Sequence, residues 1–108
     1  MIRNYPLHAR LFINRIIRIR KRLILNDESK LDHGMAIRII ANLEKYLDYY
    51  PFNTRQSMSK FVLRHASEIM FLIPGKTSKS HKRLMQSFNE IYSEAIAIKK
   101  EKPKPALI

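Results

Sequence analysis

The sequence contains no cysteine, which excludes a disulfide framework and a zinc site built on thiolates. Histidine is scarce as well, and the four that are present lie too far apart along the chain for the paired spacing of a metal site. These residues are His8, His33, His65 and His81. We therefore expect the protein to bind no metal and no other cofactor.

Glycine and long apolar runs are also scarce. Two glycines in 108 residues leave few positions that require a positive φ, and five prolines divide the chain into four segments and a tail. Charged residues interrupt every apolar run before the roughly 18 to 20 residues that cross a bilayer, so we expect no transmembrane segment. The length is that of one domain.

Acidic residues are outnumbered, with nine Asp and Glu against 21 Lys and Arg, so the net charge is +12. Residues 1–26 carry seven basic residues and no acidic one, while residues 77–108 carry seven against three. A surplus of this size is typical of proteins that bind a polyanion. The N-terminal segment and the last third of the chain are therefore the expected binding regions.

Residues 7–25 show a helical pattern of apolar and basic side chains. With successive residues placed about 100° apart, the apolar ones gather on one arc and the basic ones on the opposite arc. The apolar arc is predicted to face a core. A strand is the alternative interpretation, because Arg18, Arg20 and Arg22 alternate along the middle of the segment. The basic residues of the outward arc are Arg10, Arg15, Arg18, Lys21 and Arg22.

Three later segments show the same helical periodicity. Ser29 and Thr54 are the predicted N-caps of the first two, and Pro51 ends the earlier of them. Pro and Gly residues then separate the third segment from the last. The predicted helices span residues 31–50, 54–72 and 80–100.

These four helices define the expected fold. Short connections between amphipathic helices favour antiparallel neighbours, so the fold class is all-α, as an up-down four-helix bundle. One helical domain covers residues 1–100. Residues 101–108 are predicted to form an extended, basic C-terminal tail, because the prolines there cannot continue a helix.

The outward arc of the first predicted helix is the strongest functional feature. Arg15, Arg18 and Arg22 lie at helical spacing, and Arg10 and Lys21 flank them. The arginine fork matches phosphate oxygens, so a row of arginines along a helix suits a sugar-phosphate backbone. A solvated surface usually mixes both signs of charge, whereas the first 26 residues contain no acid, which favours binding.

A second basic cluster lies in the stretch GKTSKSHKR, around the predicted start of the last helix. Lys76, Lys79, Lys82 and Arg83 there would surround free backbone N–H groups, which together form an anion site. A polar loop that only caps the helix is an equally good interpretation. The GKT triplet is not a nucleotide-binding P-loop, because Met70 stands where that motif requires glycine.

The stretch YYPF, residues 49–52, offers aromatic rings that could stack on unpaired bases. Tyr50 lies on the apolar arc of its helix, however, so core packing is favoured over stacking. His65 and Arg20 both interrupt apolar arcs. We expect His65 to be a hydrogen-bonded core residue, and Arg20 to reach solvent or to pair with a carboxylate. The carboxylates considered for Arg20 are Glu44, Asp48 and Glu68.

The segment RQSMSKFVLRHA, residues 55–66, resembles the second helix of ribbon-helix-helix DNA-binding proteins, where a Ser-x-Ser start leads into an apolar and basic helix. The resemblance implies that IIRIRKRL, residues 16–23, is a strand that reads bases in DNA. Under that alternative, Arg18, Arg20 and Arg22 would all face the bases.

The sequence thus predicts a protein that binds nucleic acid and is not an enzyme. Glu90 and Glu94 share a helix face, but no histidine, metal set or glycine-rich loop accompanies them. We expect RNA rather than DNA, because the charge is too dispersed for one groove-reading helix, within a larger ribonucleoprotein assembly that includes other proteins. A helical subunit that docks on an acidic protein or a membrane surface is the remaining alternative.

The expected location is the cytoplasm. The mitochondrial matrix is the alternative, because the acid-free, arginine-rich N-terminal segment resembles a mitochondrial targeting segment. Base preference and oligomeric state are left open by the sequence.

Overall fold

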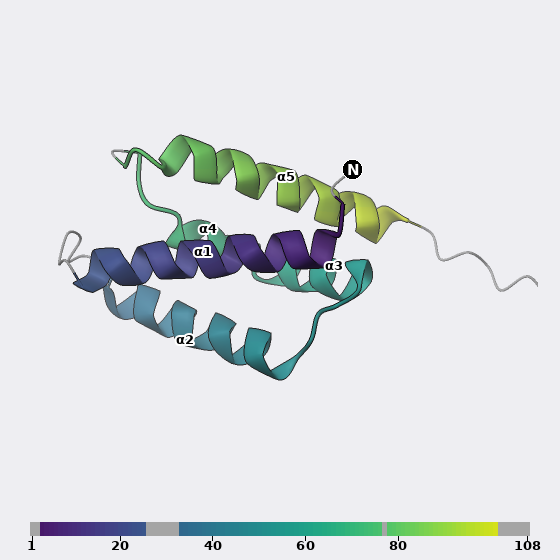
Figure 1. Ribbon diagram of the computed structural model, residues 1–108, viewed down its shortest axis with the longest axis horizontal. Coiled ribbons are helices and arrows are strands. Elements are labelled where there is room, and N and C mark those ends of the chain that lie inside the picture. The colour runs from purple at the N-terminus through teal and green to yellow at the C-terminus, as the bar shows by residue number, and fades with distance from the viewer. Residues whose placement is uncertain (1–2, 26–32, 77, 102–108) are drawn as a thin grey trace, which may run out of the picture.

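A computed structural model of the protein describes residues 3–25, 33–76 and 78–101. These ranges contain five α-helices and no strand, so the predicted all-α class is confirmed (Figure 1). Ser29 and residues 102–108 of the predicted tail lie outside the described residues. The helices are α1 (Tyr5–Leu25), α2 (His33–Tyr49), α3 (Arg55–Arg64), α4 (Ala66–Leu72) and α5 (His81–Lys100).

The segment predicted as either helix or strand is helical throughout α1. The strand interpretation of its middle is therefore wrong, and the base-reading ribbon implied by the resemblance to ribbon-helix-helix proteins is not formed. The apolar arc of α1 supplies much of the core, because apolar residues three and four positions apart lie on one helix face. The buried residues of α1 are Tyr5, Pro6, Ala9, Phe12, Ile13, Ile16 and Ile17.

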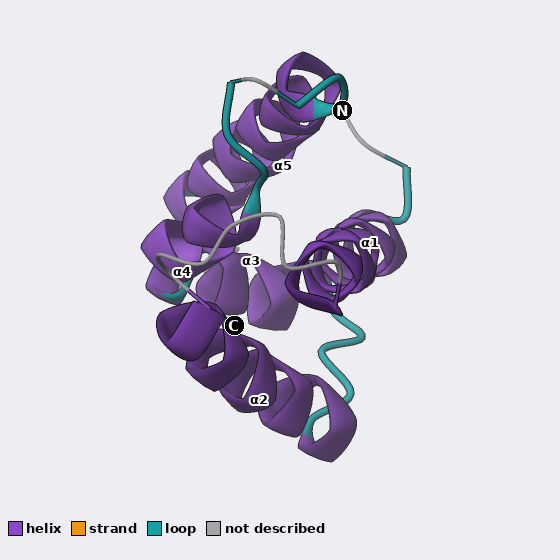
Figure 2. Ribbon diagram, turned by 90° about the vertical axis from the view of Figure 1, so that its left-hand side faces the viewer, coloured by secondary structure: helices purple, strands orange, loops and turns teal. Residues whose placement is uncertain are grey.

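The helices alternate in direction along the molecule, with α1, α3 and α4 running one way and α2 and α5 the other (Figure 1). Seen from one end, α1 and the α3–α4 pair lie between α2 and α5 (Figure 2). Helix α1 packs against each of the other four helices, and α3 makes the most extensive contact, with α5. The α1 helix and the α3–α5 contact therefore both contribute to the core.

Residues 54–72 form two helices where one was predicted. The backbone leaves helical geometry at His65, with φ −110° and ψ 20°, although Ile69 N–H still donates to the His65 carbonyl at 2.9 Å. The break accompanies burial of the imidazole, whose centroid lies 5.4 Å from that of Tyr46 and 4.8 Å from that of Phe61. The His65 Nδ1 atom lies 2.8 Å from Glu68 Oε1, so the predicted hydrogen-bonded core histidine is confirmed.

The predicted cap of the third helix is present. The Thr54 hydroxyl accepts from Ser57 N–H at 3.0 Å, and the Ser57 hydroxyl accepts from Thr54 N–H at 3.3 Å. This reciprocal pair satisfies two backbone donors that the start of α3 would otherwise leave without partners.

Arg20 caps the end of α4 from its position on α1. Its guanidinium donates through Nη2 to the Phe71 carbonyl at 2.7 Å and through Nε to the Leu72 carbonyl at 3.2 Å. Two of the carboxylates considered for Arg20 have other partners, since Glu44 pairs with Lys21 and Glu68 with His65. Arg20 is partly buried and faces α4, as its position on the apolar arc of α1 predicted.

Two polar contacts join α5 to the starts of α1 and α3, which lie toward the same end of the molecule (Figure 1). The buried Tyr5 hydroxyl donates to the Ile91 carbonyl at 3.0 Å. Burial raises the pKa of the Tyr5 phenol above its ordinary range, and the Glu94 carboxylate raises it further. Arg55 pairs with Glu101 at 2.8 Å, which links the start of α3 to the end of α5.

Candidate nucleic-acid interface

The arginine row predicted on α1 faces solvent. Arg15, Arg18 and Arg22 are exposed, on the side opposite the buried arc. Within the described part of the chain, none of the three forms a hydrogen bond or an ion pair. Helix α1 contains no acidic residue to offset these three charges, and we call Arg15, Arg18 and Arg22 the arginine row.

Leucines extend the same side of α1. Leu7, Leu11 and Leu25 are 50%, 58% and 84% exposed, and they lie at helical spacing with the arginine row. Isolated exposed leucines are ordinary, but here they stand in line with the charge at both ends of one helix. The outer side of α1 is therefore apolar at its ends and cationic in its middle.

Two of the five basic residues predicted on this arc bind within the protein instead. Arg10 donates to the Leu47 carbonyl at 3.0 Å, to the Tyr50 carbonyl at 3.3 Å and to the Pro51 carbonyl, and so caps the end of α2. Carbonyl groups at a helix end attract cations through the helix dipole, which accounts for this placement. The structure therefore gives Arg10 a role in the fold.

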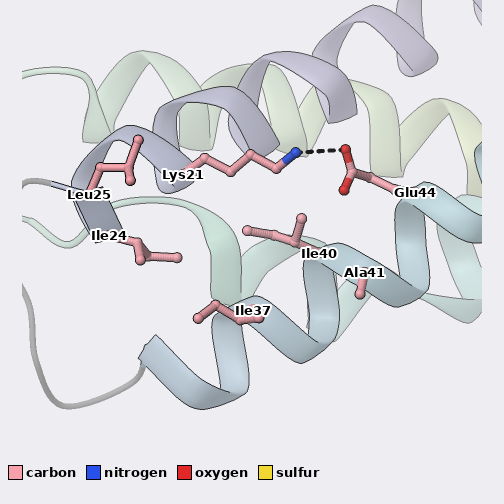
Figure 3. A pocket seen from close by; sticks show the side chains of 7 residues that line it. All are labelled: Lys21, Ile24, Leu25, Ile37, Ile40, Ala41 and Glu44. Carbon is pink, nitrogen blue, oxygen red and sulfur yellow. Dashed lines mark hydrogen bonds and ion pairs between the residues drawn. The ribbon is translucent and has the colours of Figure 1, made fainter.

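Lys21 is the second of these residues. Its ammonium lies 2.9 Å from Glu44 Oε2, in an exposed ion pair that joins α1 to α2. Figure 3 shows this pair at one side of an apolar cleft of about 330 Å³. The paired carboxylate offsets the positive charge of Lys21, whereas the arginines of the row have no such partner among the described residues. The cleft is lined by Lys21, Ile24, Leu25, Ile37, Ile40, Ala41 and Glu44.

The second predicted cluster is exposed at the start of α5. Lys76, Lys79, Lys82 and Arg83 all reach solvent, and no side chain caps the helix at Ser80. The turn before α5 is fixed by the His81 imidazole, whose Nδ1–H donates to the Pro74 carbonyl at 2.7 Å. The positive end of the helix dipole adds to these four cations. Thr77, which follows Lys76 in this stretch, lies outside the described residues.

The two basic regions share one end of the molecule. Helix α1 ends and α5 begins at the same end, so Arg22 and the second cluster lie on that end together (Figures 1 and 2). From there the arginine row continues along α1 toward its middle. The alternating helix directions expected from the sequence imply this arrangement, because the first helix of an up-down bundle ends where the last helix begins.

The aromatic stretch at the end of α2 is more exposed than predicted. Tyr49 is 77% exposed and Tyr50 is 53% exposed, because α2 ends at Tyr49 and the chain turns away there. The predicted core position of Tyr50 is therefore wrong. Phe52 is half-buried instead, with its ring centroid 4.6 Å from that of Phe61.

No family model, curated protein or solved structure matches this chain. None of the helices in the described ranges is both long and apolar enough to cross a membrane.

Proposed function

We propose that this protein binds the phosphate backbone of nucleic acid without catalysing a reaction. The observation that carries the proposal is the arginine row, three exposed guanidinium groups on a helix without an acidic residue. Guanidinium groups at helical spacing suit successive phosphate oxygens, and their contacts hold the backbone whatever its base sequence. The cluster at the start of α5 extends this surface.

The residues assigned to phosphate are those that remain exposed. They exclude Arg10, which donates to carbonyls at the end of α2, and Lys21, which is paired with Glu44. The contact residues are Arg15, Arg18, Arg22, Lys76, Lys79, Lys82 and Arg83.

RNA is the proposed nucleic acid, and a ribonucleoprotein assembly in the cytoplasm is the proposed setting. The positive charge lies on two separate elements rather than on one helix shaped to enter a DNA major groove. The exposed leucines of α1 would then contact other proteins of the assembly.

A salt titration of binding tests the proposal. Replacing Arg15, Arg18 and Arg22 together with glutamine should weaken binding to unrelated sequences alike. The slope of log affinity against log salt should flatten by roughly 2 to 3 units, since each lost phosphate contact removes about 0.7 to 0.9. Salt-insensitive binding by the natural protein would contradict the proposal.

Arg38 supplies the matched control. It is an exposed arginine on α2, outside both basic regions, so Arg38→Gln should leave the slope nearly unchanged beside Arg18→Gln. Equal effects of the two single substitutions would show that net charge alone, and not the arginine row, sets the affinity.

A second candidate function is docking on an acidic protein, favoured by the leucines in line with the arginine row. Competition between RNA and polyglutamate for the protein separates the two candidates. RNA should displace polyglutamate at equal charge concentration under the first proposal. Preferential binding of polyglutamate, weakened by Leu7→Gln and Leu11→Gln, would favour the second.

A further inference from the structure

An aromatic pocket lies between the end of α2 and the outer side of α3. Its volume is about 310 Å³, and no residue of α1 or α5 lines it. Tyr46 and Tyr50 stand nearly parallel, with an interplanar angle of 22° and centroids 6.1 Å apart, and Phe52 lies 5.7 Å from Tyr50. The lining residues are Tyr46, Tyr50, Phe52, Ser57, Lys60, Phe61, Arg64 and His65.

Two cations border these rings. Lys60 and Arg64 lie one turn apart on α3, and both are exposed. Within the described ranges neither forms an ion pair, so their charges are available to an anion. A pocket with aromatic faces and unpaired cations at its edge matches a base joined to a phosphate.

The rings are held in a strained turn. Phe52 has φ 41°, in the left-handed region that an aromatic residue rarely adopts. The turn is fixed from α1, because Arg10 donates to the carbonyls of Tyr50 and Pro51. Strain of this kind persists only where the surroundings impose it, and it is common where a ligand is held.

Burial of apolar surface does not account for this arrangement. A turn that served only to cover the core would bury Tyr50, whereas this residue is 53% exposed. The inner members, Phe61 and His65, are buried and form the floor. The pocket therefore has a packed floor and an open aromatic wall.

We propose that this pocket holds an unpaired nucleotide of single-stranded RNA, with the base stacked on Tyr50, the Phe52 ring tilted at 54° beside it, and the phosphate on Lys60 and Arg64. The inference rests on the proposed function, since it names the form of nucleic acid that is bound. It adds a preference for single strands, because a paired base cannot leave its stack without breaking the duplex.

Binding of a single-stranded RNA carrying a fluorescent purine analogue, beside a duplex of equal length, tests the inference. Tyr50→Ala should weaken single-strand binding by about five- to one-hundred-fold, abolish the quenching of the analogue, and leave duplex binding unchanged. Tyr49→Ala is the matched control, since Tyr49 is adjacent, more exposed and not part of the pocket, and it should bind like the natural protein.

A second variant keeps the test independent of Tyr50 packing. Lys60→Gln combined with Arg64→Gln changes only exposed side chains, and it should flatten the single-strand salt slope by roughly 0.7 units per lost contact. Melting temperatures of all variants establish that the fold is retained.

The outcomes distinguish the two proposals. If Tyr50→Ala and Tyr49→Ala both bind like the natural protein while the arginine-row variant binds weakly, the pocket proposal is overturned and the proposed function stands. If the natural protein binds neither RNA form at low salt, the proposed function is overturned and the pocket proposal with it.

Discussion

Removal of the Arg20 guanidinium should destabilise the protein while leaving its outer surface intact. Arg20→Gln loses the hydrogen bonds to the carbonyls of Phe71 at 2.7 Å, Leu72 at 3.2 Å and Ile73 at 3.5 Å. It also leaves the end of α4 without the cation that its dipole favours. The effect should therefore appear in the free energy of unfolding.

The expected loss is about 2 kcal/mol. Hydrogen bonds to a charged group contribute roughly 1.5–3 kcal/mol, and glutamine retains one donor that can reach part of the site. For a domain of this size, a loss of about 2 kcal/mol lowers the melting temperature by roughly 8–16 °C. Thermal and urea unfolding followed by circular dichroism measure both quantities.

Arg18→Gln is the control, because Arg18 is exposed on the opposite side of α1 and surface changes usually fall within about 0.5 kcal/mol. The two variants should also differ in binding, with Arg18→Gln weakening affinity for nucleic acid and Arg20→Gln changing it little at temperatures where the protein is folded. An Arg20→Gln variant as stable as Arg18→Gln would refute the capping role.

Two further substitutions test contacts at the helix starts. Tyr5→Phe should lower stability at neutral pH by about 0.5–1.5 kcal/mol through loss of the bond to Ile91. Because folding raises the pKa of Tyr5, its stabilisation of the fold is complete below a pH of about 10 and is lost above it, by up to roughly 1.4 kcal/mol per pH unit. The free energy of unfolding in urea should therefore decline less steeply at alkaline pH for Tyr5→Phe than for the natural protein. Thr54→Ala removes the hydroxyl that caps α3 and should lower the free energy of unfolding by about 1 kcal/mol. Ser67→Ala, at an exposed site in α4, is the control and should change it little, so equal losses in the two variants would argue against the cap.

Helical periodicity predicted most of the fold, because the apolar arcs of the sequence are the surfaces that the helices bury. The observed starts and ends lie within about two residues of those predicted. The break at His65 was missed, since the apolar periodicity continues on both sides of it, and the contact of the His65 ring with Tyr46 of α2 forms only in the folded protein. The exposure of Tyr50 was missed because α2 ends one residue earlier than predicted.

The candidate site was predicted in part. Periodicity placed Arg15, Arg18 and Arg22 on the outer side of α1, where the structure has them. It could not separate Arg10 from this row, because the acceptors of Arg10 are backbone carbonyls about 40 residues away, and carbonyls have no sequence signature. The phosphate-binding role of the row stays a prediction.

The two arginine caps also determine how the protein should unfold. Helix α2 ends on Arg10 and α4 ends on Arg20, so both helices depend for their last turns on side chains from α1. Neither helix can therefore keep its native end when α1 detaches, and partial opening at one helix removes support from the others. The chain should consequently unfold as a single cooperative unit, without a stable intermediate made of residues 33–101 alone.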